Sequence, residues 1–284
     1  MNRHVGILVF VTLVWGTTFP LLKSAAATLS GVEISAIRFA FATLCMAPFL
    51  RRVPAATWRD GAILGALALV SYVTQAYGLQ YISSNRSAFL TSLNVLMVPL
   101  LGLLWGGTLS ALTLACALAA CLGIGLMSWE GGAHLLGDGA TLLCALAYAL
   151  YVIVLSQRAA EHDARQLTAT QILFMTVFAG LWVVASDASS GTLHSLNQRL
   201  LPHLWPLVYL GLIATAGMLL LQAMAQKHVS ADKAAVIYAM EPVFAALFGW
   251  IWLGEVLTER AALGGAIVVL AVIASEIKFG KNEA

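Results

Sequence analysis

Two polar residues inside apolar runs have the side chains and the spacing to do chemistry in a membrane. Asn94 follows Arg86 by eight residues, and Glu241 follows Lys233 by the same number. Eight residues span about 12 Å of helix, so both side chains should lie near the middle of a hydrocarbon layer about 30 Å thick. Contact of either group with lipid would cost several kcal/mol, and both are therefore expected to face the interior of a helix bundle.

The carboxyl group of Glu241 has two interpretations at this stage. It could bind the amine of a substrate or carry a proton that couples transport to a gradient. Alternatively, it could be an uncharged acid that hydrogen-bonds a backbone group freed by Pro242, because proline has no N–H and interrupts the helix. The choice between them depends on what surrounds the carboxyl group.

Polar side chains without a fixed charge form a second candidate set. Gln75 and Gln222 are 147 residues apart, the same separation as Asn94 and Glu241. Amides, hydroxyls and aromatic faces suit a zwitterion or a neutral solute with an apolar side chain, although each could also serve as an interhelical hydrogen bond. The predicted substrate-binding residues are Trp15, Gln75, Tyr77, Asn94, Tyr148, Tyr151, Gln222 and Tyr238.

A third set is predicted to act in gating or in shaping the helices. Arg38 lies about 10 Å along its expected helix, where it could clamp a carboxylate or act as a gate, or be a structural cation paired with a carboxylate or carbonyl. Pro99, Glu241 and Pro242 complete this set. The six histidines lie in termini, loops or helix ends and the four cysteines lie in apolar runs, so no metal site and no cofactor are expected.

The composition predicts the element that must position these residues, the membrane-spanning helix. The 284 residues are 61% hydrophobic and 10% charged, and the mean hydropathy is +0.89, which does not fit a soluble domain. Ten spans are expected, at Val5–Leu22, Val32–Leu50, Trp58–Leu79, Ser87–Trp105, Leu112–Trp129, Gly137–Ser156, Leu167–Ala185, Trp205–Ala225, Ala234–Leu253 and Ala261–Phe279. The predicted fold is an all-α membrane protein.

The distribution of charge predicts an orientation. If both termini are cytoplasmic, ten Lys and Arg residues lie on the cytoplasmic side and four lie outside, as the positive-inside rule requires. This arrangement predicts a multi-pass membrane protein with both termini cytoplasmic. It also places Arg86 outside and Lys233 inside, so the two halves would have opposite orientations.

The chain contains an internal repeat. Residues 78–111 align without a gap on residues 225–258, and the matches include Ser83 with Ser230, Arg86 with Lys233 and Trp105 with Trp252. A repeated unit with a polar residue at mid-membrane depth is typical of secondary transporters. The chain is therefore predicted to hold two inverted five-helix repeats, residues 1–131 and 132–284, around a central cavity.

Several motifs resemble the EamA family of the drug/metabolite transporter superfamily. The segment from Glu241 to Ala246 and the segment from Leu253 to Thr258 resemble the end of the second EamA domain, and Trp15-Gly16 and Arg38-Phe39 resemble its opening pattern. Among bacterial members the chain is most similar to YddG-type amino-acid exporters, and this resemblance implies a location in the bacterial inner (plasma) membrane. It departs from the pattern in the first half, where Thr108 stands in place of the second half's Glu255.

The resemblance implies a secondary transporter that exports amino acids, aromatic and other neutral ones, or related small metabolites from the cytoplasm by alternating access. The alternative is a broad metabolite or drug efflux carrier driven by proton exchange. An enzyme is not expected, because one buried Glu without His or Asp neighbours supplies no catalytic set. The expected partners are a small-molecule substrate and the lipid bilayer, with no nucleic acid and no required oligomer. Uncoupled transport is the favoured hypothesis, with Glu241 holding a broken helix in shape.

Overall fold

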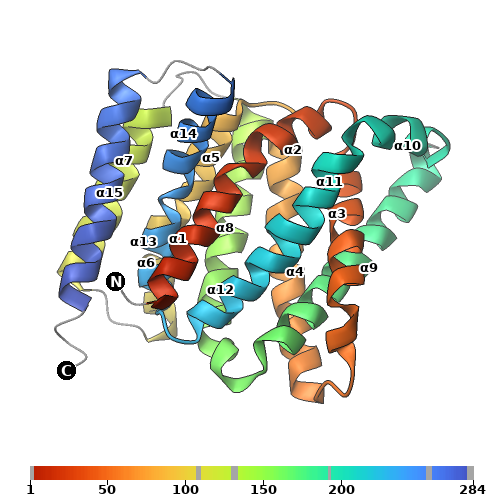
Figure 1. Cartoon of the computed structure of the whole chain (residues 1–284), viewed down its shortest axis with the longest axis horizontal. Coiled ribbons are helices and arrows are strands. Elements are labelled where there is room, and N and C mark those ends of the chain that lie inside the picture. Colours follow the sequence, from red (N-terminus) through yellow and green to blue (C-terminus); the bar gives the residue numbers. More distant parts are fainter. Residues whose placement is uncertain (1–2, 107–109, 129–133, 191–192, 254–257, 280–284) are drawn as a thin grey trace.

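The computed structural model describes residues 3–106, 110–128, 134–190, 193–253 and 258–279, and the regular elements in these ranges are all helices (Figure 1). The first half of the chain forms α1 (Arg3–Gly16), α2 (Thr18–Ala26), α3 (Gly31–Met46), η1 (Ala47–Leu50), α4 (Ala55–Gly78), α5 (Ser84–Ser92), α6 (Asn94–Gly102), η2 (Leu103–Trp105) and α7 (Ala111–Ser128). The boundary predicted between the halves, at residues 131 and 132, lies outside the described residues.

The second half is also helical throughout its described residues. It forms α8 (Leu135–Arg158), η3 (Ala159–Glu161), α9 (Ala164–Ser190), α10 (Leu193–Leu200), η4 (Leu201–His203), α11 (Leu204–Gly211), η5 (Leu212–Gly217), α12 (Met218–Gln226), α13 (Ala231–Tyr238), α14 (Glu241–Leu253) and α15 (Glu259–Phe279). The segment η5 is a single stretch of π-helix that joins α11 to α12.

Six helical stretches are long and apolar enough to cross a membrane, which confirms the prediction of an all-α membrane protein. They are Arg3–Ala26, Gly31–Leu50, Ala55–Gly78, Leu135–Glu161, Ala164–Ser186 and Ser195–Gln226. The helix Ala111–Met127 is apolar but shorter. The expected total of ten spans stays a prediction, because two of the remaining predicted spans are divided into shorter helices.

These two divided helices break at equivalent places. The first consists of α5 and α6, which meet at Leu93. The second consists of α13 and α14. The second segments begin at Asn94 and Glu241, and the first segments begin at Ser84 and Ala231, so both pairs of starting points are 147 residues apart. The internal repeat in the sequence is therefore also a repeat of helix starts and breaks.

Small residues allow close helix packing at several crossings. The helices α7 and α15 lie side by side at one end of the molecule (Figure 1), and a Cβ atom on Gly123 would lie 2.7 Å from the carbonyl oxygen of Gly264. A Cβ atom on Gly65 would lie 2.7 Å from the carbonyl oxygen of Gln171, where α4 crosses α9. Glycine removes the side chain that would otherwise separate such backbones.

Two ion pairs join helix ends on the side of the membrane that the sequence predicts to face away from the cytoplasm. Arg86 Nε lies 2.6 Å from Asp138 Oδ1, which joins α5 to α8. Arg199 Nη2 lies 2.6 Å from Glu33 Oε1, which joins α10 to α3. The Glu33 carboxylate also accepts the backbone N–H of Ser30 in a capping box at the start of α3.

Candidate functional site

A polar cavity of about 40 Å³ lies inside the bundle. Its walls come from α1, α2, α3, α4, α5, α8 and α14. The lining residues are Trp15, Thr18, Arg38, Ser71, Tyr72, Gln75, Thr91, Tyr148 and Glu241. Five of them belong to the residues predicted from sequence to bind substrate or to act in gating, so residues distant in the chain meet at one place.

The cavity in this conformation is smaller than a substrate. Ligand pockets usually measure about 300–1,000 Å³, whereas this space of about 40 Å³ holds a few water molecules. A solute could enter only if the surrounding helices moved apart. The site in this structure is therefore too narrow to hold such a solute.

The guanidinium group of Arg38 is held from two directions. Its Nε and Nη2 donate hydrogen bonds to Thr215 Oγ1 at 3.1 and 2.9 Å, and its Cζ lies 4.6 Å from the centre of the Tyr72 ring. Nη2 also lies 3.5 Å from the carbonyl oxygen of Leu210. These contacts fit the structural interpretation of Arg38, while its place in the cavity wall fits the carboxylate clamp.

The carboxyl group of Glu241 faces the cavity from the first residue of α14. It makes no hydrogen bond and no ion pair with any residue that the structure describes. The bond to a freed backbone group, proposed from the neighbouring Pro242, is therefore not observed. Pro242 is the second residue of α14, in the first turn, where a missing N–H removes no intrahelical bond within α14.

An aromatic cluster surrounds one side of the cavity. The ring centre of Trp15 lies 6.0 Å from that of Tyr148 and 5.9 Å from that of Tyr238. Tyr148 also stacks with Tyr151 at 5.9 Å. Trp15 and Tyr148 line the cavity, and Tyr151 and Tyr238 lie behind them, where their hydroxyls donate to Gln171 and Gln226.

The two repeat-related glutamines have different positions. Gln75 lines the cavity, with its Nε2 3.5 Å from Thr91 Oγ1. Gln222 is fully buried and donates from Nε2 to the hydroxyl of Tyr148 at 3.1 Å. Gln222 therefore supports a lining residue and is not itself part of the wall.

Four further predicted residues lie outside the cavity wall. Tyr77 is 39% exposed, and its hydroxyl accepts from Tyr81. Asn94 is buried and donates to the carbonyl oxygen of Thr91 at 2.8 Å, next to the break between α5 and α6. Pro99 lies inside α6, and Pro242 lies in the first turn of α14. Their roles in substrate binding or gating remain predictions.

Thr215 is a contact of the site that the sequence did not indicate. It lies in η5, is fully buried, and bonds Arg38 although 177 residues separate the two. Threonine is common in apolar helices, where its hydroxyl normally bonds a carbonyl of its own helix. The equivalent position in the first half is occupied by Ala68. The internal repeat therefore did not mark Thr215 as a candidate site residue either.

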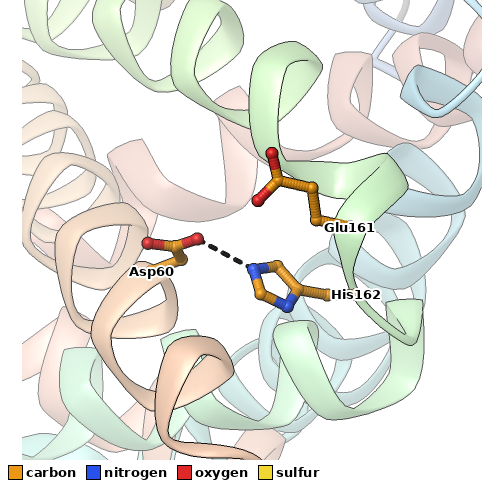
Figure 2. A group of neighbouring side chains, drawn as sticks. All are labelled: Asp60, Glu161 and His162. Carbon is orange, nitrogen blue, oxygen red and sulfur yellow. Dashed lines mark hydrogen bonds and ion pairs between the residues drawn. The ribbon is translucent and has the colours of Figure 1, made fainter.

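A second polar group lies where α4 meets the connection between α8 and α9, away from the cavity. His162 Nε2 lies 2.8 Å from Asp60 Oδ2, and His162 Nδ1 lies 3.0 Å from Thr57 Oγ1. Figure 2 shows Glu161 beside this pair, and ligand atoms of the three residues lie within 4.8 Å of one another. This spacing would allow a cation to bridge them.

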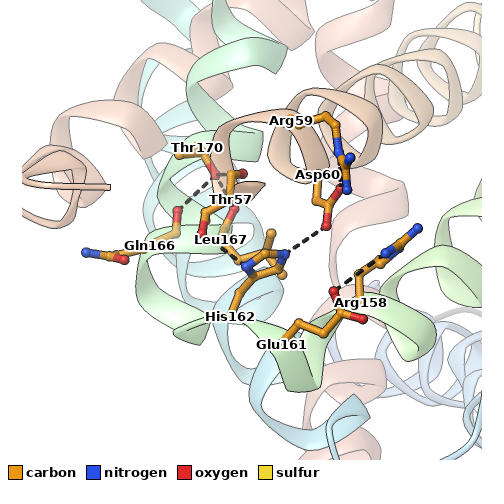
Figure 3. Close-up of polar contacts among 9 residues, drawn as sticks. All are labelled: Thr57, Arg59, Asp60, Arg158, Glu161, His162, Gln166, Leu167 and Thr170. Carbon is orange, nitrogen blue, oxygen red and sulfur yellow. Dashed lines mark hydrogen bonds and ion pairs between the residues drawn. The ribbon is translucent and has the colours of Figure 1, made fainter. Parts of the chain in front are cut away.

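The surrounding charges favour a structural role for this group. Arg59 Nε pairs with Asp60 at 3.1 Å and Arg158 Nη1 pairs with Glu161 at 3.5 Å (Figure 3), so both carboxylates already have a cation. Lys227 Nζ donates to the carbonyl oxygen of His162, which ties α12 to the same point. The group therefore holds three parts of the bundle together at one end.

The apolar spans and the cavity lined by polar side chains define the class, a multi-pass helical membrane protein with an interior polar site. Residues 4–129 and 135–275 match the model of the EamA-like transporter family. The chain belongs to this family, which lies in the drug/metabolite transporter superfamily. The family assignment confirms the resemblance to the EamA family, while the similarity to YddG-type amino-acid exporters stays a prediction.

Known proteins of similar sequence and structure agree with this assignment. An uncharacterized transporter of Archaeoglobus fulgidus is 30% identical over 268 residues, which cover 94% of this chain and 83% of the relative. A second uncharacterized transporter of that organism is 24% identical over 278 residues, covering 96% and 98%. A protein crystal structure aligns with a TM-score of 0.76 at 17% identity, covering 97% of this chain and 98% of that one, and so shows the fold. The family and the relatives indicate a membrane transporter and not an enzyme.

Proposed function

We propose that this protein exports amino acids, aromatic and other neutral ones, or closely related metabolites from the cytoplasm by alternating access. The observation that carries the proposal is the presence of Arg38 and Glu241 in the wall of one cavity. A guanidinium group suits a carboxylate and a carboxylate suits an ammonium group. A zwitterion presents both groups at a short separation.

The rest of the wall fits the remainder of such a solute. Trp15, Tyr72 and Tyr148 offer aromatic faces, and Ser71 and Thr91 offer hydroxyls. An aromatic or aliphatic side chain could pack against the rings, because such faces gain from burial of apolar area. The combination supports a neutral amino acid over a purely apolar drug.

The proposed architecture is ten spans in two inverted repeats, residues 1–131 and 132–284, in a plasma membrane with both termini cytoplasmic. Three observations support it. The family model matches the chain twice, at residues 4–129 and 135–275. Helix breaks recur 147 residues apart at Asn94 and Glu241. The charge distribution follows the positive-inside rule if each half contributes five spans.

Alternating access requires that contacts at the two ends of the bundle open in turn. The pairs Arg86–Asp138 and Glu33–Arg199 join helices at the end predicted to face outward, and we propose that they separate when that end opens. The bond from His162 to Asp60 joins helices at the end predicted to face the cytoplasm. In the proposed cycle, the contacts at one end break while those at the other end stay formed.

Counterflow into liposomes that contain this protein alone tests the proposal. Vesicles loaded with unlabelled phenylalanine should take up labelled phenylalanine well above protein-free vesicles, while putrescine and glucose should exchange at the protein-free rate. The variant Arg38→Gln should lose most of the exchange, because it removes the cation that would bind the carboxylate of the substrate. Absence of counterflow for every neutral amino acid tried would refute the proposed substrate class.

Proton exchange is the second candidate mechanism, and the free carboxyl group of Glu241 is the observation that favours it. A coupling group must be reachable from both sides in turn and must not be committed to a structural bond. Glu241 meets the second condition within the described part of the chain. Net uptake with and without an imposed pH gradient distinguishes this mechanism from uncoupled transport.

A further inference from the structure

The π-helical segment η5 contacts two residues of the cavity wall. Thr215 accepts hydrogen bonds from Arg38, and the carbonyl oxygen of Ala214 accepts from Nε1 of Trp15 at 2.9 Å. A π-helical turn shifts the backbone bonding pattern by one residue, and Ala214 here offers its carbonyl to a neighbouring helix. The segment therefore connects the eighth predicted span to residues from α1 and α3.

Neighbouring groups satisfy the whole hydrogen-bonding capacity of the Thr215 hydroxyl. It donates its hydrogen to the carbonyl oxygen of Leu210 at 2.7 Å. It accepts from Nε of Arg38 at 3.1 Å and from Nη2 at 2.9 Å. A hydroxyl has one donor and two acceptor lone pairs, so these three bonds fix the orientation of its hydrogen and satisfy the group completely.

These bonds determine where the guanidinium group of Arg38 points. An arginine side chain has many rotamers, and holding it in one of them costs conformational entropy. The two bonds to Thr215 fix one edge of the planar group, and the Tyr72 ring lies against its face at 4.6 Å. Nη1 has no hydrogen bond with the residues that the structure describes, while Arg38 itself lines the cavity.

We propose that Thr215 is a positioning residue for carboxylate recognition, because it holds Arg38 with Nη1 available to the carboxylate of the transported solute. This inference rests on the proposed function, since it assigns the carboxylate of an amino acid to Arg38. Thr215 does not touch the solute. Its effect should therefore appear as selectivity for solutes that carry a carboxylate.

The test compares Thr215→Val with Thr215→Ser in the liposome counterflow assay. Valine keeps the shape of threonine but cannot accept the two bonds from Arg38, whereas serine keeps the hydroxyl. The measured quantities are the apparent KM for phenylalanine and the inhibition constant of phenylalaninamide, which has the same ring and ammonium group but no carboxylate. Thermal unfolding in detergent identifies any variant that fails to fold.

For Thr215→Val we expect the KM for phenylalanine to rise roughly tenfold, the size of a lost bond to a charged group. The inhibition constant of phenylalaninamide should change less than twofold, and Thr215→Ser should restore the wild-type KM. If the valine variant does not fold, Thr215→Ala gives the same comparison with a smaller side chain that leaves room for water.

Two other results would overturn the inference. Equal changes for both ligands would show that Thr215 only supports the fold, and unchanged KM values would show that Arg38 does not depend on it. In either case wild-type counterflow of phenylalanine would leave the proposed function standing. Wild-type protein that exchanged no amino acid would refute the proposed function and this inference together.

Discussion

Asn94 and Glu241 begin the second segments of two broken helices 147 residues apart, and the structure gives their side chains different tasks. Asn94 donates to the carbonyl oxygen of Thr91 at 2.8 Å, beside the break in its own helix. Glu241 faces the cavity and has no hydrogen-bond partner among the described residues. Of these two equivalent residues, Asn94 makes a local structural hydrogen bond, whereas the carboxyl group of Glu241 is available to bind a solute.

This difference predicts unequal effects of substitution at the two positions. Glu241→Gln removes the charge that would pair with a substrate ammonium group, a contact worth about 1.5–3 kcal/mol. We expect the KM of a transported amino acid to rise at least roughly tenfold. Asn94→Ala is the matched control, and it should lower the unfolding temperature in detergent while changing KM less than about threefold. The reverse pattern would assign substrate binding to Asn94.

Energy coupling gives a second prediction at the same carboxyl group. A carrier that exports a metabolite down its gradient needs no coupling ion, and the ammonium group of the solute can itself pair with Glu241. Wild-type protein should therefore equilibrate an amino acid across liposomes but not accumulate it when a pH gradient is imposed. Accumulation that depends on the gradient and disappears in Glu241→Gln would establish proton exchange instead.

The two glutamines should affect transport through different routes. Gln75 lines the cavity, so Gln75→Ala should raise KM with little loss of stability. Gln222 is fully buried and bonds the hydroxyl of Tyr148, so Gln222→Ala should also destabilise the fold by about 1–3 kcal/mol, since it leaves a buried hydroxyl without its donor. Paired measurements of counterflow and thermal unfolding check both. Normal transport at limiting substrate by both variants would assign the glutamines to packing.

The inverted topology can be tested by labelling single cysteines. Asn85 is exposed before the helix break in the first half, and Ser230 is exposed at the equivalent turn of the second half. In a background without native cysteines, a membrane-impermeant maleimide should label Asn85→Cys in intact cells and Ser230→Cys only after permeabilisation. Labelling of both from the same side would rule out inversion of the two halves.

The contact between His162 and Asp60 should contribute to stability. Asp60 is 2% exposed, and loss of a partner leaves a buried acid with fewer hydrogen bonds, which costs about 2–3 kcal/mol. His162→Ala should therefore lower the unfolding temperature clearly. Glu161→Ala is the control, because its side chain is 56% exposed and its ion pair is long, so its effect should stay within about 0.5 kcal/mol. Equal effects of the two variants would contradict this interpretation.

The sequence by itself determined the class of protein, the internal repeat and the helix break beside Pro242, whereas the matching break at Leu93 became visible only in the structure. Apolar runs long enough to span a bilayer can be recognised from the sequence alone, and they show that lipid surrounds these helices without any knowledge of tertiary contacts. The repeat is likewise a linear property, and it placed Asn94 and Glu241 at equivalent depths. Five residues predicted to bind substrate or act in gating were also found in the cavity wall: Trp15, Arg38, Gln75, Tyr148 and Glu241.

The tertiary structure decided which polar residues share the cavity and what holds them there. A helix turns by about 100° per residue, so depth in the membrane does not say which neighbour a side chain meets. Gln75 and Gln222 match in the repeat, yet one lines the cavity and the other supports Tyr148. Arg38 meets Thr215 across 177 residues, because the packing of α3 against η5, not any local pattern, brings the guanidinium group and the hydroxyl together.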